Sequence, residues 1–277
     1  QEAGYTTGFV GKWGLGPCFT EGAPNKQGFD FFYGFNCQRQ AHTYYPVHLW
    51  KNNEKDTLDN CVIAPGTPLA DNADPRDQNS YARYTQNDYA PDLMLEEALH
   101  FMERNRNRPF FLEYATVIPH VPLQAPEHWV QYYRKKFGEE EPFRGHRLYF
   151  PCRFPRATYA AMISYMDENV GKLVEKLKET GIYEHTLILF SSDNGPTNVA
   201  VGPDTDWFNS AGPFREEYGY IKGSLQEGGI RVPMIAVWPG STPQGRETNH
   251  LSAFWDVFPT LCDVAGTHPP QDLNIDG

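Results

Sequence analysis

The chain has 277 residues, which is long enough to bury a large core as one α/β domain or one domain with a small appendage. Its formal net charge of −11 argues against a nucleic-acid partner, although a few local cations can still bind a small anion in one cleft. No uninterrupted apolar run is long enough to span a bilayer, so we expect no membrane-spanning segment.

The first predicted element is a short strand at residues 7–10, which leads into a glycine-rich loop at residues 11–16. The glycines of this loop predict a tight turn whose backbone approaches another group closely. Lys12 is its only cation. A turn with a solvated lysine and an anion-binding loop both agree with this composition, so both interpretations stay open.

Residues 17–90 are rich in Gly, Pro, Asn, Asp and aromatic residues, and few of their segments are periodic. We therefore expect a long irregular region, of the kind that often forms binding loops in compact enzymes. The polar side chains available there to bind sugar hydroxyls or an anion are Gln38, Arg39 and His42. The aromatic side chains available to stack on a sugar are Tyr44 and Trp50. The alternative is that the polar groups only satisfy the loop backbone.

Helical spacing of apolar residues predicts a helix with Asp92 as its N-cap. A buried strand is predicted at residues 110–117, and it ends in the loop Ile118-Pro119-His120-Val121-Pro122. Two prolines hold His120 in place, which favours a functional imidazole, although a single histidine is more often structural. A long amphipathic helix at residues 159–177 follows, and we expect it to be scaffold.

The apolar run at residues 187–190 predicts a buried strand that ends near Asp193-Asn194-Gly195. Ligands of open α/β sheets bind just outside the carboxyl ends of the strands. Asp193 and Asn194 offer side-chain oxygens, which suit a hard cation such as calcium or magnesium. A simple turn after a strand accounts for the same three residues equally well.

A further strand is predicted at residues 235–238, and Asp256 is expected to cap a last helix that closes at Gly266. Strands alternate with helices, so we predict an α/β fold with a mainly parallel sheet flanked by helices. The five cysteines are odd in number and include no Cys-x-x-Cys pair. That pattern argues against a zinc site and a full disulfide framework, and it leaves one or two disulfide bridges open.

Four stretches, in this order, resemble the sulfatase family of the alkaline-phosphatase-like superfamily. They are Gly-Tyr-Thr-Thr-Gly at 4–8 with Gly-Lys-Trp-x-Leu-Gly at 11–16, Pro-His-x-Pro at 119–122, Asp-Asn-Gly at 193–195, and Lys222 with Glu-Gly-Gly-Ile-Arg-Val-Pro at 227–233. The resemblance covers nearly the whole chain. The segments at 28–35 and 37–42 look most like bacterial members of the arylsulfatase-A type, many of which act on sulfated carbohydrates.

This resemblance implies an alkaline-phosphatase-like fold and a sulfuric-ester hydrolase that acts on a sulfated carbohydrate or an aryl sulfate. Lys12, His120 and Lys222 match residues that hold the sulfate group, the histidine and one lysine being placed to assist the leaving oxygen. Asp193 and Asn194 match two of the calcium ligands, and magnesium is the alternative ion. Export to the periplasm or the extracellular space is implied by the same resemblance.

The chain departs from the family pattern in two places. The family nucleophile is a formylglycine made from Cys or Ser in a Cys/Ser-x-Pro-x-Arg motif, and neither that motif nor the first pair of metal-binding aspartates precedes Gly4. Gly14 stands where many members have a histidine that contacts the nucleophile, so this role is absent, filled by another residue such as His42, or performed differently. We therefore expect residues 1–277 to be a partial catalytic domain, without the nucleophile segment and the C-terminal subdomain, and inactive as given.

Two other functions agree with the same motifs. The first is a phosphoester or phosphonate hydrolase of the same superfamily, which would share the metal-binding strand end. The second is a relative without catalytic activity that only binds sulfated glycans, which Gly14 and the missing nucleophile motif both permit.

Overall fold

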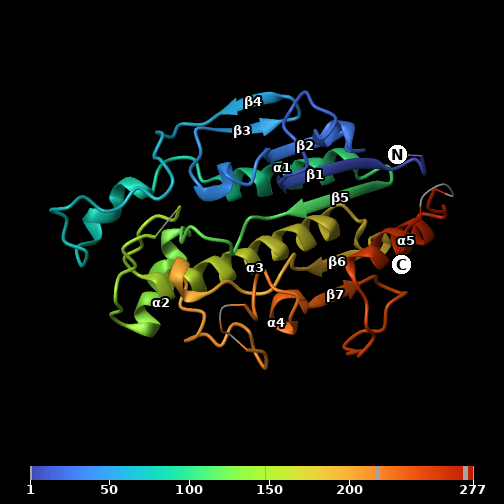
Figure 1. The fold of residues 1–277 in the computed structure, drawn as a ribbon. Helices are drawn as coiled ribbons and strands as arrows, with labels where there is room; N and C mark the ends of the chain where they lie inside the picture. Colours follow the sequence, from blue (N-terminus) through green and yellow to red (C-terminus); the bar gives the residue numbers. More distant parts are fainter. Residues whose placement is uncertain (1, 147, 216, 218, 271–273, 277) are drawn as a thin grey trace.

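A five-stranded sheet is the main feature of the computed structural model, which describes residues 2–146, 148–215, 217, 219–270 and 274–276. The strand order is β4-β3-β2-β1-β5 (Figure 1). β1 runs parallel to both β2 and β5, whereas β3 and β4 continue the sheet in antiparallel fashion. The strands are β1 (Thr6–Lys12), β2 (Phe31–Phe35), β3 (His48–Lys51), β4 (Glu54–Thr57) and β5 (Phe110–Ala115).

The three parallel strands end at the same edge of this sheet. Lys12 pairs with Phe35 of β2, and Gly11 pairs with Ala115 of β5. Gly11 has a φ of 137°, and a Cβ there would lie 2.0 Å from the carbonyl oxygen of Ala115, so only glycine is accommodated. Because the carboxyl ends of parallel strands meet, the loops that follow β1, β2 and β5 lie next to one another.

Helices cover this sheet, and their buried side chains form the core with those of the strands (Figure 1). α1 packs on β1, β2 and β5, and α3 packs on both α1 and α2. The core includes the fully buried side chains of Val10, Tyr44, Met94 and Met162. The α-helices are α1 (Ala90–Asn105), α2 (Glu127–Phe137), α3 (Pro155–Glu179), α4 (Glu227–Ile230) and α5 (Phe254–Val264). Short 3₁₀ turns are η1 (Pro24–Lys26), η2 (Gln40–His42), η3 (Gln78–Tyr84), η4 (Tyr183–His185) and η5 (Val199–Val201).

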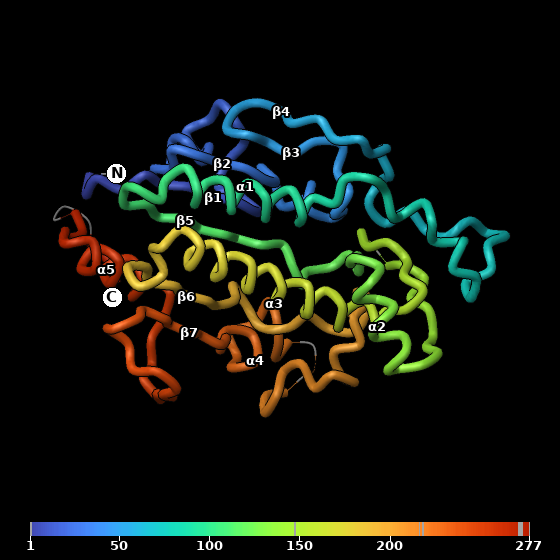
Figure 2. Tube along the Cα trace, turned by 180° about the vertical axis from the view of Figure 1, so that it is seen from behind, coloured from blue at the N-terminus to red at the C-terminus, as the bar shows by residue number. Residues whose placement is uncertain are grey.

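A separate antiparallel pair is formed by β6 (Ile188–Ser191) and β7 (Met234–Val237). Figure 2, which shows the chain from behind, and Figure 1 both show α3 between β5 and this pair. Within the described ranges, no helix is long and apolar enough to cross a membrane.

The predicted α/β class is confirmed, and the expected strands near 7–10, 110–117, 187–190 and 235–238 correspond to β1, β5, β6 and β7. The expected irregular region at 17–90 was wrong in part, because it contains β2, β3 and β4. These strands are short, and sheet neighbours stabilise them more than their own sequence does.

The structure also corrects the two predicted helix starts and decides the disulfide alternative that the sequence left open. Asp92 is not the N-cap of α1, since the helix already begins at Ala90 after Tyr89, with a proline in its first turn. The Asp92 carboxylate instead accepts a hydrogen bond from the Tyr165 hydroxyl on α3. Asp256 lies inside the first turn of α5, where its carboxylate accepts the backbone N–H of Ala253 at 2.6 Å. All five cysteines are free, so the disulfides that the sequence left open are not formed.

Candidate functional site

Lys12 is the last residue of β1, and the residue after it fastens the loop that follows. The Trp13 backbone N–H donates to the Phe35 carbonyl oxygen at 2.8 Å, and its indole N–H donates to the Gly22 carbonyl oxygen at 2.8 Å. The Trp13 ring is buried against Phe9, with 5.0 Å between ring centroids. The half-buried Lys12 side chain is therefore held at the edge where the parallel strands end.

The loop after β5 carries His120, and a buried tyrosine holds this loop in place. Tyr44 has no exposed surface, and its hydroxyl donates to the Val117 carbonyl oxygen at 2.8 Å while also contacting the His120 carbonyl oxygen. The His120 Nδ1 atom lies 2.6 Å from the Val121 carbonyl oxygen. This contact assigns the proton of the neutral ring to Nδ1 and leaves Nε2 free to accept or carry a proton.

Two histidines from different loops lie together at this edge. The His42 and His120 rings are stacked, with centroids 6.2 Å apart and planes 15° apart. The Tyr149 ring lies beside both, at 5.3 Å from His42 and 6.3 Å from His120. The Nδ1 atom of His42 is buried and has no hydrogen-bond partner among the described residues. A cavity of about 30 Å³ is lined by Lys12, Gln38, Ala41, His42, Val117 and His120.

Burial and nearby positive charge lower the pKa of both histidines and favour their neutral forms. Burial and the neighbouring cations, first Lys222 and then Lys12, lower the pKa of His120 to about 4. Burial and the charges of Lys12, Arg39 and Lys222 likewise lower the pKa of His42. Positive charge thus gathers at one edge of a chain whose net charge is negative, so the edge attracts anions. A bound anion would stabilise the protonated imidazoles and raise both pKa values.

Lys222 lies near Lys12 and the two histidines, although it is far from them in sequence. Its side chain keeps contact with solvent, yet the surrounding protein atoms remove enough water to lower its pKa, and Lys12 lowers the pKa further. Asp193 acts in the opposite direction and raises the Lys222 pKa. The Lys222 backbone N–H donates to the Pro196 carbonyl oxygen at 3.0 Å, which ties Lys222 to the turn that carries Asp193.

This turn, Asp193-Asn194-Gly195, packs closely on the segment around Gly228. The Gly195 N–H donates to the Gly229 carbonyl oxygen at 2.9 Å, and a Cβ at Gly195 would lie 1.9 Å from the Gly228 carbonyl oxygen. Glycine is required at this position because the obstacle is backbone, which cannot move aside.

Asp193 and Asn194 offer oxygen ligands of the kind that calcium binds, but they are too few to fill its coordination shell. Asp193 is exposed, Asn194 is half-buried, and the Asn194 amide donates to the Asp193 carboxylate. Calcium takes about six to eight oxygen ligands. Among the described residues no group of three or more His, Cys, Asp or Glu side chains is arranged to hold a metal ion. These two residues alone do not make a complete cation site.

Most of the predicted site residues are brought together. Lys12, Gln38, His42 and His120 line one cavity, and Lys222 is close enough to shift the pKa of both histidines. Arg39 is exposed and does not line the cavity, although its charge acts on His42.

Sequence reasoning was wrong about one residue of this region and missed another. Tyr44 was expected to stack on a sugar, but it is completely buried and supports the His120 loop. Tyr149, which flanks both histidines, was not predicted, and no local pattern marks it.

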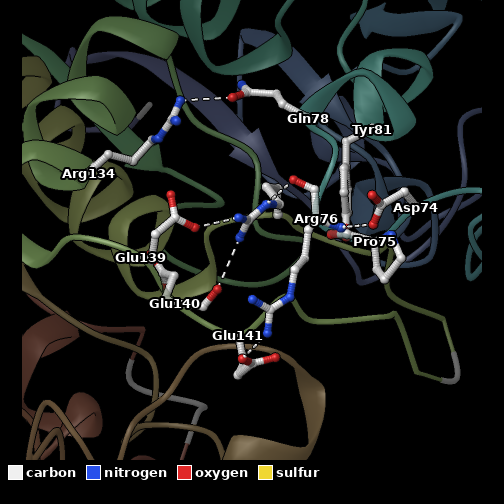
Figure 3. Close-up of polar contacts among 10 residues, drawn as sticks. Asp74, Pro75, Arg76, Gln78, Tyr81, Arg134, Glu139, Glu140 and Glu141 are labelled. Carbon is white, nitrogen blue, oxygen red and sulfur yellow. Dashed lines mark hydrogen bonds and ion pairs between the residues drawn. The ribbon is translucent and has the colours of Figure 1, made fainter.

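A larger cavity of about 330 Å³ lies elsewhere, at the N-terminus of α3. Figure 3 shows the polar contacts of some residues that line it, among them Arg76, Glu139 and Glu141. The charged side chains of this cavity are paired with one another: Arg76 with Glu141 at 2.7 Å, and Arg156 with Asp204 at 2.7 Å. The Glu140 carboxylate accepts the backbone N–H of Arg156 at 2.6 Å and so caps the helix. These charged side chains therefore find their partners within the protein.

The whole chain was compared with known proteins and structures. A family profile described as Sulfatase matches residues 1–267. The chain is 32% identical over 291 residues to N-acetylgalactosamine-6-sulfatase of Canis lupus familiaris, covering 100% of this chain and 46% of that protein. It is 30% identical over 290 residues to the Homo sapiens protein of the same name, covering 100% of this chain and 45% of that protein. The chain spans about half the length of the curated relatives it matches.

Solved structures with a similar fold are found as well. Ps i-CgsB in complex with k-i-k-neocarrahexaose is 28% identical, with a TM-score of 0.72 over 100% of this chain and 54% of that chain. BT4656 in complex with D-glucosamine-2-N,6-O-disulfate is 20% identical, with a TM-score of 0.66 over 98% of this chain and 60% of that chain.

Proposed function

The chain belongs to the sulfatase family, and on that basis we propose that the gene product that includes it hydrolyses sulfate esters. The observation that carries the proposal is the cluster of Lys12, Lys222, His42 and His120 at one edge of the sheet. A sulfate ester has spread negative charge, and transfer of its sulfuryl group depends mainly on positioning and electrostatic stabilisation, as for phosphoryl groups.

In this proposal each cationic or imidazole group has a separate role. Lys12 and Lys222 bind the sulfate oxygens and stabilise the charge that develops on them. His120 donates a proton from Nε2 to the leaving oxygen, because its Nδ1 is engaged by the Val121 carbonyl oxygen. Burial and the neighbouring lysines lower the pKa of His120 to about 4, so the negative charge of the substrate is needed to raise the pKa and allow His120 to carry the proton.

The nucleophile and the cation belong to the same proposal. The nucleophile would be a formylglycine from a segment outside residues 1–277. Asp193 and Asn194 would supply two oxygen ligands of a calcium or magnesium ion, with the remaining ligands also outside this chain. Such an ion would neutralise negative charge on the sulfate group.

The substrate is proposed to be a sulfated carbohydrate or an aryl sulfate. The curated relatives named above are N-acetylgalactosamine-6-sulfatases, and one structural relative holds a sulfated glucosamine. Gln38 and Arg39, which follow β2 beside the cavity, are proposed to contact the substrate. Export from the cytoplasm is proposed from family membership alone.

The test uses the full-length gene product with 4-nitrophenyl sulfate, 4-nitrophenyl phosphate and sulfated saccharides as substrates. Peptide mass spectrometry would look for formylglycine in the same preparation. We expect sulfate release that Lys12→Ala lowers about a hundredfold or more, the typical loss for one preorganised contact. The exposed Lys26→Ala serves as the matched control and should leave the rate unchanged. If only the phosphate ester is hydrolysed, the proposal is wrong and the protein is a phosphoester hydrolase. Glycan binding without turnover would replace it with a binding protein.

A further inference from the structure

Two loops that follow parallel strands meet beside the anion-binding cavity. The loop after β1 contains Gly14, and the loop after β2 contains Gln38 and His42. Successive turns shape the second loop, with backbone N–H groups of Ala41 and His42 donating to the carbonyl oxygens of Gln38 and Arg39 at 3.2 and 3.3 Å. Gln38 and His42 lie at the two ends of this short run of turns. Both line the cavity.

Gln38 occupies the space in which a side chain at position 14 would begin. A Cβ on Gly14 would lie 2.2 Å from the Gln38 Nε2 atom and 2.8 Å from its Cδ atom. The Nε2 atom lies 3.5 Å from the Gly14 carbonyl oxygen, which is too long for a strong hydrogen bond. The amide therefore rests over Gly14 without being held there tightly, and its second N–H group can donate to a ligand.

We propose that Gly14 and Gln38 work as a pair, in which the missing side chain at position 14 admits the Gln38 amide to donate a hydrogen bond to a sulfate oxygen. The identity of the anion rests on the proposed function. In this pair Gln38 contacts the anion, and Gly14 is a positioning residue that acts through Gln38.

A neutral amide suits this position for an electrostatic reason. Lys12, Lys222 and Arg39 already lower the pKa of His42. A further cation at position 38 would make either histidine still harder to protonate. The amide adds a donor for the anion without adding charge, so it strengthens binding while leaving the histidines able to take up a proton.

The test measures binding of inorganic sulfate to the full-length gene product by isothermal titration calorimetry at pH 6. Gly14→Ala and Gln38→Ala should each weaken binding about tenfold, the usual effect of losing one hydrogen bond to a charged group. The double variant should also lose about tenfold, because both changes remove the same contact. Gly14→Ala combined with Gln38→Asn should recover part of the loss, since the shorter amide leaves room for the added methyl group. Gln38→Glu should weaken binding more than Gln38→Ala does, because a carboxylate repels sulfate.

Gly171→Ala is the matched control, since a Cβ there meets no atom within 4 Å, and it should leave sulfate binding unchanged. Losses that multiply to about a hundredfold in the double variant would overturn the pairing. So would unaltered binding in Gly14→Ala, or a wild-type protein that binds no sulfate. Turnover separates the two proposals. If the wild type hydrolyses sulfate esters but the losses multiply, only the pairing fails. If the losses coincide but the wild type hydrolyses no sulfate ester, only the proposed function fails.

Discussion

Tyr44→Phe should destabilise the protein through one hydroxyl group. The Tyr44 hydroxyl is completely buried, donates to the Val117 carbonyl oxygen at 2.8 Å and also contacts the His120 carbonyl oxygen. Phenylalanine keeps the ring and its packing on Tyr89, so no cavity forms. The substitution removes one net hydrogen bond and leaves the His120 carbonyl oxygen without a partner among the described residues, whereas the Val117 carbonyl oxygen still accepts the His120 backbone N–H at 2.9 Å. Together these effects are worth about 2 kcal/mol of the free energy of unfolding.

Urea denaturation followed by tryptophan fluorescence measures this loss. A loss of about 2 kcal/mol should lower the midpoint of thermal unfolding by roughly 4 to 8 °C in a domain of this size. Tyr45→Phe is the matched control, because Tyr45 is also buried but its hydroxyl makes no hydrogen bond within the described part of the chain. A loss for Tyr44→Phe below about 0.5 kcal/mol, or one equal to that of Tyr45→Phe, would refute the reasoning. The His120 imidazole signals in NMR spectra should also broaden or shift, because the loop that carries them loses its support.

Three further predictions follow from the same geometry. Lys222→Gln should raise the pKa of His120 from about 4 toward its ordinary value, because the charge of Lys222 lowers this pKa more than any other cause except burial. An NMR titration that finds the same His120 pKa in the variant would contradict this prediction. Sulfate binding should tighten as the pH falls from 7 to 5, because the anion raises the His120 pKa above about 4 and the complex takes up a proton. Calorimetry in buffers of different ionisation enthalpy measures this proton uptake. Sulfate affinity that does not change with pH would exclude the coupling. Gly195→Ala should lower stability by about 1 to 3 kcal/mol, since its Cβ would lie 1.9 Å from the Gly228 carbonyl oxygen. The control Gly171→Ala lies inside α3, where a Cβ meets no atom within 4 Å, and it should stabilise the protein by up to about 1 kcal/mol. Equal midpoints of thermal unfolding for the two variants would refute the clash.

Local sequence patterns predicted the elements whose apolar pattern is visible within their own segment. The apolar runs of β1, β5 and β6 and the helical spacing of α3 each lie within one segment, so periodicity was sufficient to find them. The patterns failed for β2 to β4. β4 (Glu54–Thr57) has mostly polar, exposed residues, and it is a strand because β3 supplies its hydrogen-bond partners. That partnership is a property of the sheet and leaves little trace in four residues.

The same division holds for the candidate site. Lys12, His120 and Asp193 each follow a predicted strand, where α/β folds gather their ligands, and the resemblance to the sulfatase family assigned them to the site. Tyr149 was missed, because its position beside both histidines results from packing between distant segments. The support of the His120 loop by Tyr44 was missed for the same reason, since the two residues are far apart in sequence.

The sequence by itself determined which chemical groups stand at the ends of strands, because strand ends, turns and side-chain types are local properties. Only the tertiary structure decided which of these groups meet. Lys12, Gln38 and His120 share one cavity because β1 lies parallel to β2 and β5, so that their loops leave the sheet at the same edge. The neutral state of the histidines depends on burial and on the charge of Lys222, which comes from a different part of the chain. Long-range pairing and solvent exclusion set both features, and neither is encoded in any single segment.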